Sequence, residues 1–240
     1  MNIAIIFAGG TGTRMNSRSK PKQFLEVHGK PVLIYTMENF QNHPLIDKII
    51  LVCVKSWIGY AQQLISKYDI TKVVKVISGG ATGQASIYRG LKAAKELYGD
   101  NHIVLIHDGV RPLIDQTTIT NCIQEVEAHG NAITVSPAVE TIYVKSDDNK
   151  NIGTVLERSR CEMARAPQCF ILNDIFKAHE KANEEGRRDF VDSASLMQYY
   201  GYDLYTVDGP AENIKITTPS DFYIFRAILD AKENSQIWGL

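Results

Sequence analysis

The first 140 residues alternate between short apolar runs and longer segments in which apolar residues recur with helical spacing. Buried parallel strands have such continuous apolar runs, and the helices that connect them cover both faces of the sheet. The pattern therefore predicts an α/β fold with a doubly wound, mostly parallel sheet. The expected strands are residues 2–7, 48–54, 73–77, 102–106 and 132–136, and the expected helices are residues 32–40, 60–68, 85–98 and 118–129.

The alternation breaks after Val139. Two extended stretches, residues 140–145 and 152–156, flank a polar turn at residues 146–151, which is typical of a projecting β-hairpin arm. Such an arm needs cover, and a second copy of the chain can supply it, so we expect a homodimer. After the arm, helices are expected at residues 172–185, 191–199 and 219–234, and strands at residues 203–207 and 213–217.

The sequence contains no internal repeat and no low-complexity linker. We therefore expect residues 1–240 to form a single domain, with the dimerisation arm at about residues 138–160. The 26 Lys and Arg residues nearly balance the 27 Asp and Glu residues, for a formal net charge of −1. No global field favours a nucleic acid partner, so any anion must bind to a local cluster of positive charge.

The N-terminal apolar run spans only about seven residues and lacks a basic region, so it is neither a signal peptide nor a membrane span. We expect a cytoplasmic protein without a membrane partner. The cysteines form no C-x-x-C pair and are expected to be reduced core thiols. They are Cys53, Cys122, Cys161 and Cys169.

A glycine-rich turn, Ala8-Gly9-Gly10-Thr11-Gly12, directly follows the first expected strand. Glycines allow backbone N–H groups to approach a ligand closely, and phosphate is the usual anion at such a turn. The turn matches only part of the dinucleotide fingerprint G-x-G-x-x-G, because Met15 occupies the third glycine position, and it does not match a Walker P-loop. Two interpretations remain open: a phosphate-binding loop, or a plain tight turn between strand and helix.

Four cations lie within nine residues after this turn, namely Arg14, Arg18, Lys20 and Lys22. A solvated basic loop would explain a charge run of this kind. The cluster adjoins the glycine turn, however, and open α/β sheets bind ligands at the carboxyl ends of their strands. In that position the cations would contact a triphosphate.

Asp108 stands at the end of another expected strand, within His107-Asp108-Gly109-Val110-Arg111-Pro112. A carboxylate opposite a phosphate loop can hold Mg²⁺, which takes one or two carboxylates together with phosphate oxygens. Alternatively, the carboxylate orders the turn into the proline. Lys215 lies on the expected strand 213–217, where a single lysine is usually solvated. The histidines form no metal-binding motif and are interpreted as structural, and the serines form no nucleophile elbow.

The order of these motifs resembles the family of cytidylyltransferases that make CDP-linked polyols from 2-C-methyl-D-erythritol 4-phosphate or ribitol 5-phosphate. The resemblance covers essentially the whole chain. Its segments are A-G-G-T-G-T-R-M at residues 8–15, P-K-Q-F at 21–24, G-G at 79–80 with Ser86 downstream, H-D-x-x-R-P at 107–112, E-T-I at 140–142, A-P-Q-x-F at 166–170 and N-I-K-I-T-T-P at 213–219.

The resemblance implies a Rossmann-like sheet of nucleotidyltransferase type and an arm exchanged across a homodimer. It also implies that CMP is transferred from CTP to a polyol phosphate, with Mg²⁺ as cofactor and pyrophosphate as product. The implied CTP site comprises Ala8, Gly9, Gly10, Gly12, Arg14, Lys22, Gly80 and Ser86. The implied acceptor site comprises Asp108, Arg111 and Lys215, with Thr141 and Arg158 reaching in from the neighbouring subunit. Arg14, Lys22 and Lys215 are the implied catalytic residues, and Asp108 is the implied metal ligand.

The sequence departs from the family pattern at three positions. The family commonly has threonine where this chain has Ala166 and Val191, and arginine where it has Gly83. Lost hydroxyls change which acceptor is preferred, because a polar group without its partner is costly. The residues Ala8-Gly9-Gly10 favour the ribitol branch. We therefore expect ribitol 5-phosphate or a similar pentitol phosphate as acceptor, with 2-C-methyl-D-erythritol 4-phosphate as the alternative.

Three other functions are weighed against this interpretation. An NAD-dependent oxidoreductase would need a third glycine and an acidic residue after the second strand, where Lys55 stands instead. A nucleotidyltransferase using UTP or GTP would suit the same sheet. A non-catalytic nucleotide-binding protein has no evident need for the charges of Arg14, Lys22, Asp108 and Lys215 around one phosphate chain.

Overall fold

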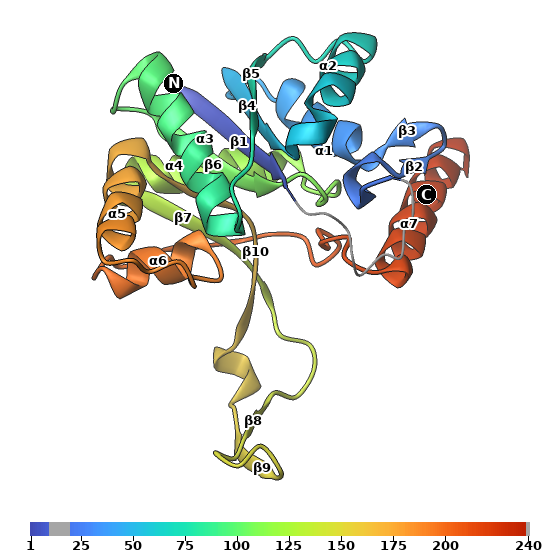
Figure 1. The fold of residues 1–240 in the computed structure, drawn as a ribbon. Helices are drawn as coiled ribbons and strands as arrows, with labels where there is room; N and C mark the ends of the chain where they lie inside the picture. Colours follow the sequence, from blue (N-terminus) through green and yellow to red (C-terminus); the bar gives the residue numbers. More distant parts are fainter. Residues whose placement is uncertain (10–19, 239–240) are drawn as a thin grey trace.

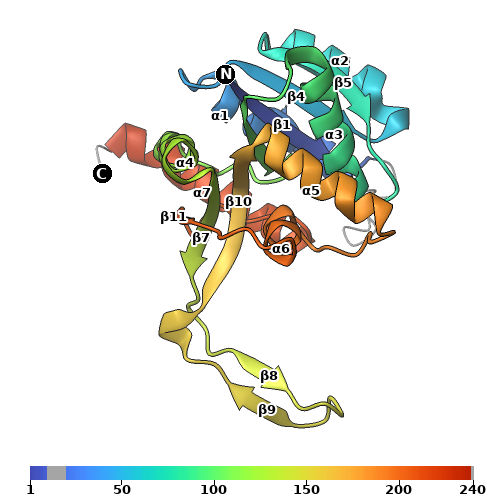
Figure 2. The ribbon, with the colours of Figure 1, turned by 90° about the vertical axis from the view of Figure 1, so that its left-hand side faces the viewer.

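The computed structural model describes residues 1–9 and 20–238. Within these residues a seven-stranded sheet forms the centre, in the order β11-β7-β10-β6-β1-β4-β5 (Figures 1 and 2). The strands are β1 (Asn2–Ala8), β4 (Lys48–Cys53), β5 (Val73–Ser78), β6 (Ile103–Asp108), β7 (Asn131–Pro137), β10 (Glu162–Ile171) and β11 (Thr206–Asp208). Neighbouring strands are parallel, except that β10 runs antiparallel to β6 and β7. The predicted α/β fold with a mostly parallel sheet is confirmed.

Helices cover both faces of the sheet because the strands are apolar on both sides. In β1, Ala4 and Ile6 pack toward α1, α2 and α4, whereas Ile3 and Ile5 pack toward α3, α5 and α6. The helices are α1 (Val32–Gln41), α2 (Ile58–Lys67), α3 (Gly83–Tyr98), α4 (Gln116–His129), α5 (Leu172–Glu184), α6 (Ser193–Tyr199) and α7 (Pro219–Trp238). The predicted helices after each strand are confirmed, with ends shifted by a few residues.

A third, smaller apolar cluster lies where α7 packs beside a short hairpin, β2 (Glu26–Val27) and β3 (Lys30–Pro31). Val27, Val110 and Phe225 are buried within it. The cluster joins the segment after β1 to the segment after β6 and to the C-terminal helix. It therefore fixes the segments that follow β1 and β6 against the C-terminal helix.

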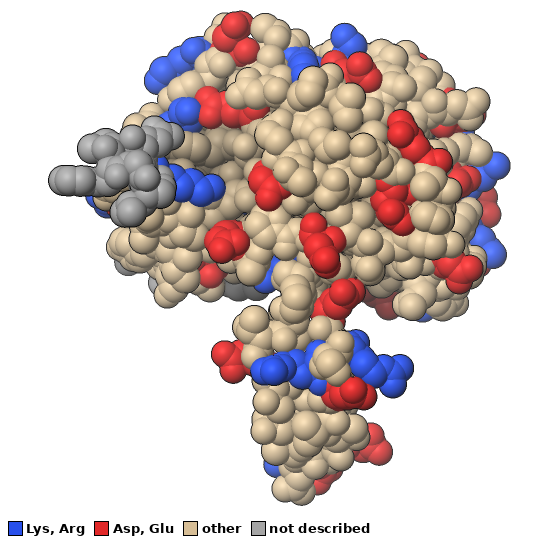
Figure 3. All heavy atoms as spheres, turned by 180° about the vertical axis from the view of Figure 1, so that it is seen from behind, with Lys and Arg blue, Asp and Glu red and all other residues tan. Residues whose placement is uncertain are grey.

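The arm projects well away from the body of the molecule, as Figures 1 and 2 show. It carries a two-stranded sheet, β8 (Tyr143–Lys145) and β9 (Ile152–Val155), followed by the 3-10 helix Arg158–Arg160. In the single chain, several apolar side chains of the arm are exposed to solvent: Ile152 is 61% exposed and Val155 is 58% exposed. Seen from behind in Figure 3, positively charged side chains form a band across the arm. The expected hairpin is thus confirmed, and it presents both apolar and basic surface.

Two expectations about the second half of the sheet were wrong. No strand was expected at residues 162–171, yet β10 lies in the middle of the sheet between β6 and β7. A strand was expected at residues 213–217, but that segment forms no β-ladder. Instead, the Ile216 N–H donates to the Val110 carbonyl, 2.9 Å away, so the segment is held by the loop that follows β6. The strand expected at 203–207 is the shorter β11.

Cys161 also differs from expectation. Cys53, Cys122 and Cys169 are buried, as expected of core thiols, but Cys161 is only half-buried at the base of the arm. The four residues form no disulfide. Among the helices that the structure describes, none is both long and apolar enough to cross a membrane.

Candidate active site

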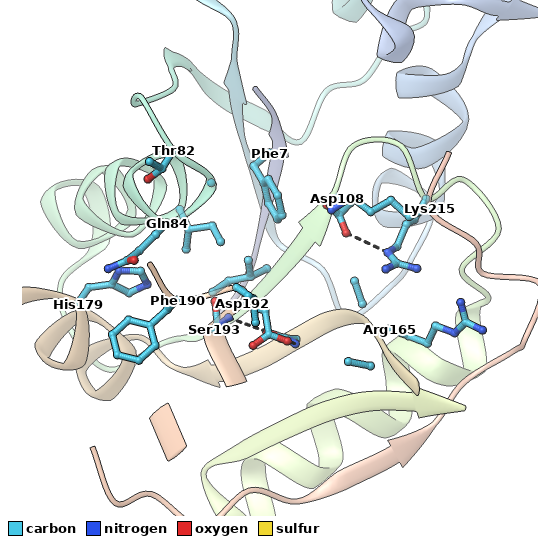
Figure 4. A pocket seen from close by; sticks show the side chains of 18 of the residues that line it. Phe7, Thr82, Gln84, Asp108, Arg165, His179, Phe190, Asp192, Ser193 and Lys215 are labelled. Carbon is cyan, nitrogen blue, oxygen red and sulfur yellow. Dashed lines mark hydrogen bonds and ion pairs between the residues drawn. The ribbon is translucent and has the colours of Figure 1, made fainter. Parts of the chain in front are cut away.

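Two adjoining pockets open at the carboxyl ends of β1 and β6. The glycine pocket, of about 590 Å³, is lined by Ala8, Gly9, Lys22, Gly79, Gly80 and Ser86 among others. The β10 pocket, of about 370 Å³, is lined by Gln84, Arg165, Gln168, His179, Asp192 and Ser193 among others (Figure 4). Both pockets share Phe7, Thr82, Gly83, Asp108 and Lys215 as walls. A ligand in one pocket would therefore meet a ligand in the other at Asp108 and Lys215.

The wall of the glycine pocket is built around Ser86, in the first turns of α3. The Gly80 N–H donates to Ser86 Oγ at 3.0 Å, and this hydroxyl donates to the Thr82 carbonyl at 2.9 Å. A Cβ atom on Gly79 would lie 2.8 Å from Ser86 Oγ, and one on Gly80 would lie 2.5 Å from the Cβ of Ala85. A side chain at either position would force Ser86 or the start of α3 to shift, so backbone atoms form this side of the pocket.

Lys22 reaches the same pocket from a short 3-10 helix, Lys22–Phe24. The neighbouring Gln23 side chain donates to the Ala8 carbonyl at 2.7 Å, which ties the helix to the end of β1. The Phe24 ring is buried and stacks on Trp57 with ring centroids 5.1 Å apart. Lys22 thus lines the same pocket as Ala8 and Gly9. Three predicted residues, Gly10, Gly12 and Arg14, lie outside the described residues.

Asp108, the last residue of β6, is held between two cations. Its Oδ1 lies 2.6 Å from Lys215 Nζ, and its Oδ2 accepts from Arg111 Nε at 2.9 Å. The Asp108 side chain is only 9% exposed. Burial acts to raise its pKa, but the charges and hydrogen bonds of Lys215 and Arg111 outweigh burial and hold the pKa below its ordinary value. The carboxylate is therefore ionised at neutral pH.

The segment that carries Lys215 is fixed from several directions. The Asn213 side chain, which is fully buried, donates to the Ala166 carbonyl of β10 at 2.6 Å. The Asn213 carbonyl in turn accepts from Arg111 Nη1 at 2.8 Å. On the other side, the Thr217 N–H and hydroxyl both donate to Asp221 at the start of α7, each at 2.8 Å. Lys215 is thus held at the junction of the two pockets although it belongs to no strand.

The β10 pocket has a polar floor that joins β10 to α6. The Gln168 amide N–H donates to Asp192 Oδ2 at 2.9 Å, and its Oε1 accepts from the backbone N–H groups of Ser193 and Ala194 at 3.0 Å. The Arg165 Nε donates to Ser136 Oγ at 2.9 Å. Arg111, Arg165, Arg188 and Lys215 give this pocket four positively charged lining residues. An anionic ligand would find several partners here.

These features are suited to binding and aligning phosphate groups. The residues in the described part of the chain include no group of three or more His, Cys, Asp or Glu side chains arranged to hold a metal ion. Backbone N–H groups can donate to phosphate oxygens at fixed positions, and Lys22, Lys215 and Arg111 can neutralise the phosphate charge. His107, beside Asp108, is fully buried and hydrogen-bonded to the Arg111 carbonyl, which agrees with the structural role predicted for it.

Comparison with known families identifies the chain. A family model described as IspD, 2-C-methyl-D-erythritol 4-phosphate cytidylyltransferase, matches residues 2–231. The chain belongs to this cytidylyltransferase family. A ribitol-5-phosphate cytidylyltransferase of Vibrio parahaemolyticus is 52% identical over 239 residues, with 100% of each chain covered. One from Streptococcus agalactiae serotype V is 50% identical over 240 residues, again with 100% of each chain covered.

Relatives named for 2-C-methyl-D-erythritol are also similar to this cytidylyltransferase. A 2-C-methyl-D-erythritol 4-phosphate cytidylyltransferase of Clostridium acetobutylicum is 42% identical over 236 residues, covering 98% of this chain and 99% of the relative. The crystal structure of 4-diphosphocytidyl-2C-methyl-D-erythritol synthase from Anaerococcus prevotii matches with a TM-score of 0.83 and 28% identity, covering 95% and 96% of the two chains. The fold expected for this family is therefore confirmed.

Two residues that the resemblance assigned to the cytidylyltransferase site lie on the arm. Thr141 and Arg158 line neither pocket of their own chain. Arg158 Nη1 donates to the Val139 carbonyl at 3.1 Å, at the base of the arm. Within one chain, the structure therefore does not bring these two side chains together with Asp108 and Lys215.

Several residues that line the β10 pocket were not predicted as site residues from the sequence. Gln168 lies within the A-P-Q-x-F segment, which carried the family resemblance but was given no role. Arg165 and Arg188 had no motif to mark them, and His179 was interpreted only as structural. These residues come from β10, α5 and the segment before α6, so their shared position depends on the fold.

Proposed function

We propose that this cytidylyltransferase transfers CMP from CTP to ribitol 5-phosphate, giving CDP-ribitol and pyrophosphate. The observation that carries the proposal is the Lys215–Asp108–Arg111 cluster at the junction of the two pockets. A positive cluster at this point lies where the phosphate of one ligand would meet the phosphate chain of the other. The choice of acceptor is supported by two relatives named for ribitol 5-phosphate that are 50% and 52% identical to this chain.

CTP occupies the glycine pocket in this proposal. Gly80 and Ser86 border the cytidine, and Ala8 and Gly9 approach the phosphates with their backbone. Lys22 and Arg14 neutralise the triphosphate, and the backbone of Gly10 and Gly12 wraps its phosphates. Gly10, Gly12 and Arg14 lie outside the described residues. The size of the pocket, about 590 Å³, is in the ordinary range for small-molecule sites.

The reaction is an in-line displacement at the α-phosphorus. An oxygen of the acceptor phosphate forms the new P–O bond, the bond between the α-phosphorus and the bridging oxygen of the β-phosphate breaks, and pyrophosphate leaves. Lys215, Lys22 and Arg14 stabilise the charge that develops on phosphate oxygens. No residue forms a covalent intermediate, because positioning and charge neutralisation supply most of the catalysis in phosphoryl transfer.

Mg²⁺ is the proposed cofactor, with Asp108 as its protein ligand. Asp108 fits this role because its pKa is held low, it forms part of both pockets, and Mg²⁺ prefers one or two carboxylates combined with phosphate oxygens and waters. When bound, the ion adds charge neutralisation to the triphosphate. Lys215 and Arg111 orient the carboxylate from both of its oxygens.

The acceptor occupies the β10 pocket, with its phosphate near Lys215 and Arg111. We propose that the enzyme is a cytoplasmic homodimer in which the arm of one subunit reaches the other. The exposed apolar residues of the arm support this arrangement, because the second subunit would cover them. Thr141 and Arg158 of the arm would then contact the acceptor phosphate of the neighbouring subunit, where Arg158 can bind it bidentately.

The second candidate acceptor is 2-C-methyl-D-erythritol 4-phosphate. It is supported by the family match and by a relative named for it that is 42% identical. Ala166 and Val191 line the β10 pocket at the two positions where the family commonly has threonine, so the pocket lacks both hydroxyls. This difference, together with the higher identity of the two relatives cited above that are named for ribitol 5-phosphate, favours ribitol 5-phosphate.

A panel of acceptors and nucleotides tests the proposed function. Pyrophosphate release is measured with Mg²⁺ and CTP for ribitol 5-phosphate, 2-C-methyl-D-erythritol 4-phosphate, arabinitol phosphate and mannitol phosphate, with UTP, ATP and GTP as controls. The proposal expects a signal that requires CTP and is strongest with ribitol 5-phosphate. Release that depends equally on UTP or GTP would contradict it, as would CTP binding without release on any acceptor.

A further inference from the structure

Unpartnered polar atoms gather at one end of the β10 pocket. In the described residues, eight buried side-chain nitrogen and oxygen atoms have no hydrogen-bond partner. Four of the eight belong to three residues that line this pocket: Gln84 Oε1, both ring nitrogens of His179, and Ser193 Oγ. The three residues are 8%, 1% and 2% exposed. Native proteins rarely leave such groups unpaired, so their presence around one cavity indicates a polar ligand.

Each of the three side chains is held in place by its surroundings. The Gln84 amide N–H donates to the Arg187 carbonyl at 3.0 Å, which leaves Oε1 available as an acceptor. The His179 ring stacks beside Tyr88, with centroids 6.0 Å apart. Ser193 is the first residue of α6, and its backbone N–H is fixed by Gln168 Oε1. The polar atoms are therefore positioned before any ligand binds.

The chemistry of the three groups matches a hydroxyl rather than a phosphate. Burial lowers the pKa of His179 to about 4, so the ring is neutral and offers one donor and one acceptor. The Ser193 hydroxyl can also donate and accept, and Gln84 Oε1 can only accept. Since a hydroxyl both donates and accepts, each of these groups can bind one. None of the three carries a positive charge, whereas Lys215, Arg111 and Arg165 of the same pocket do.

The Asp108–Lys215 ion pair lies at the other side of the pocket, whereas Asp192 adjoins Ser193. Figure 4 shows Asp108 and Lys215 on one side, with Gln84 and His179 across from them. Apolar side chains of Phe7, Ile87 and Ile106 also line the pocket. A ligand that fills the pocket would therefore be anionic at one end and rich in hydroxyl groups at the other.

We propose that Gln84, His179 and Ser193 bind hydroxyl groups of the acceptor's polyol chain and so select acceptors by their hydroxyls. This inference rests on the proposed function, because it takes the acceptor phosphate to lie near Lys215. A site built to hydrogen-bond a hydroxyl discriminates strongly against an analogue that lacks it, since its own polar groups are then left unpaired. The three residues are thus specificity determinants rather than catalytic residues.

The test compares two acceptors that differ in one hydroxyl. We would measure kcat/KM for ribitol 5-phosphate and for 1-deoxyribitol 5-phosphate, which lacks the hydroxyl farthest from the phosphate, with the complete enzyme, CTP and Mg²⁺. The wild type is expected to prefer ribitol 5-phosphate by roughly 30-fold or more. Ser193→Ala and His179→Phe should each reduce this preference at least about fivefold, mainly through a higher KM for ribitol 5-phosphate, whereas the deoxy acceptor should be little affected.

Ser195→Ala is the matched control. Ser195 lies two residues further along the same helix, lines neither pocket, and bonds only to the helix cap at Asp192. This variant should melt at a lower temperature but retain the wild-type preference between the two acceptors.

The outcomes separate the two proposals. If the wild type shows no CTP-dependent product with any acceptor, the proposed function is wrong. If the wild type is active but Ser193→Ala and His179→Phe keep the full preference for ribitol 5-phosphate, the inference is wrong and the proposed function stands. Should His179→Phe fail to fold, as judged by circular dichroism, the result with Ser193→Ala decides alone.

Discussion

Lys215 Nζ lies 2.6 Å from Asp108 Oδ1, although the two residues are 107 positions apart in the sequence. Arg111 binds the other carboxylate oxygen, so the aspartate is clamped between two cations at the point where both pockets meet. The pair thus joins the end of β6 to the segment before α7. It gives the proposed reaction a fixed positive group beside the phosphates before either substrate binds.

Lys215 is expected to be essential for the rate. Lys215→Ala should lower kcat by about 10²–10³, because it removes a preorganised donor from the developing phosphate charge. Steady-state kinetics with CTP and ribitol 5-phosphate measures the effect, and circular dichroism checks the fold. Lys92→Ala, at an exposed position of α3, is the matched control and should keep the wild-type rate. A near-normal kcat for Lys215→Ala would exclude it from catalysis.

Asp108 is expected to contribute to stability as well as to activity. Asp108→Ala should lower the free energy of unfolding by about 3–5 kcal/mol, because Arg111, whose side chain is 11% exposed, would be left without its buried partner. Urea denaturation at pH 7 gives this quantity. A loss below about 1 kcal/mol would mean that the clamp does not stabilise the fold.

The two buried histidines predict how stability depends on pH. Burial lowers the pKa of His107 and of His179 to about 4, below the value near 6.5 of an unfolded chain. Between pH 4 and 6.5 the unfolded chain binds more protons than the folded one, so the unfolding free energy should rise with pH across this window. Each histidine can contribute at most about 3 kcal/mol.

Urea denaturation at pH 4.5 and pH 7 checks this prediction. His179→Phe should show a smaller difference between the two pH values than the wild type, because one of the two groups is gone. Other groups titrate equally in both proteins. Equal differences in wild type and variant would show that His179 takes up its proton at the ordinary pH.

Substitution by alanine should have opposite effects on stability at two nearby glycines, Gly80 and Gly83. In Gly80→Ala the new Cβ would lie 2.5 Å from Ala85 Cβ, so the start of α3 must shift, and we expect a loss of about 1–3 kcal/mol and a higher KM for CTP. At Gly83, the first residue of α3, a new Cβ would meet no atom within 4 Å apart from its chain neighbours and the backbone of its own helix, and Gly83→Ala should be neutral or stabilise by about 0.5–1 kcal/mol. Thermal melts distinguish the two, and equal melting temperatures would contradict the prediction.

The proposed arm exchange predicts complementation between defective subunits. Light scattering should give twice the chain mass of 26.8 kDa. Arg158→Ala damages the arm and Lys215→Ala the body, so a mixed dimer has one site with both residues intact. Mixing the two variants under conditions that exchange subunits should restore up to half of the wild-type activity per mixed dimer. A monomeric mass, or no gain in activity on mixing, would contradict the exchange.

Local sequence patterns were sufficient to predict the parallel strands of the sheet. β1, β4 and β6 are unbroken apolar runs, and the turn after β1 carries its glycines in one short stretch. Asp108 was found for the same reason, because it ends an apolar strand. Lys215 was found only through the family resemblance, since its surroundings in the sequence suggest a strand that does not form.

The antiparallel strand β10 could not be predicted from the sequence pattern. β10 carries Arg165, Pro167 and Gln168 in its middle, which break the apolar run, and its ladder with β7 shifts register between Ala164 and Gln168. The β10 pocket depends on this strand, so its polar lining was missed too. Gln84, His179 and Ser193 come from three different helices, and only the packing of those helices brings them to one cavity.

The most direct test of the account is a competition between the two acceptors. Equal concentrations of ribitol 5-phosphate and 2-C-methyl-D-erythritol 4-phosphate are incubated with the enzyme, Mg²⁺ and limiting CTP, and the products are resolved by mass spectrometry. The account predicts that CDP-ribitol forms in large excess, with one pyrophosphate released for each CTP consumed. A predominance of the methylerythritol product, or consumption of CTP without either CDP-polyol, would contradict it.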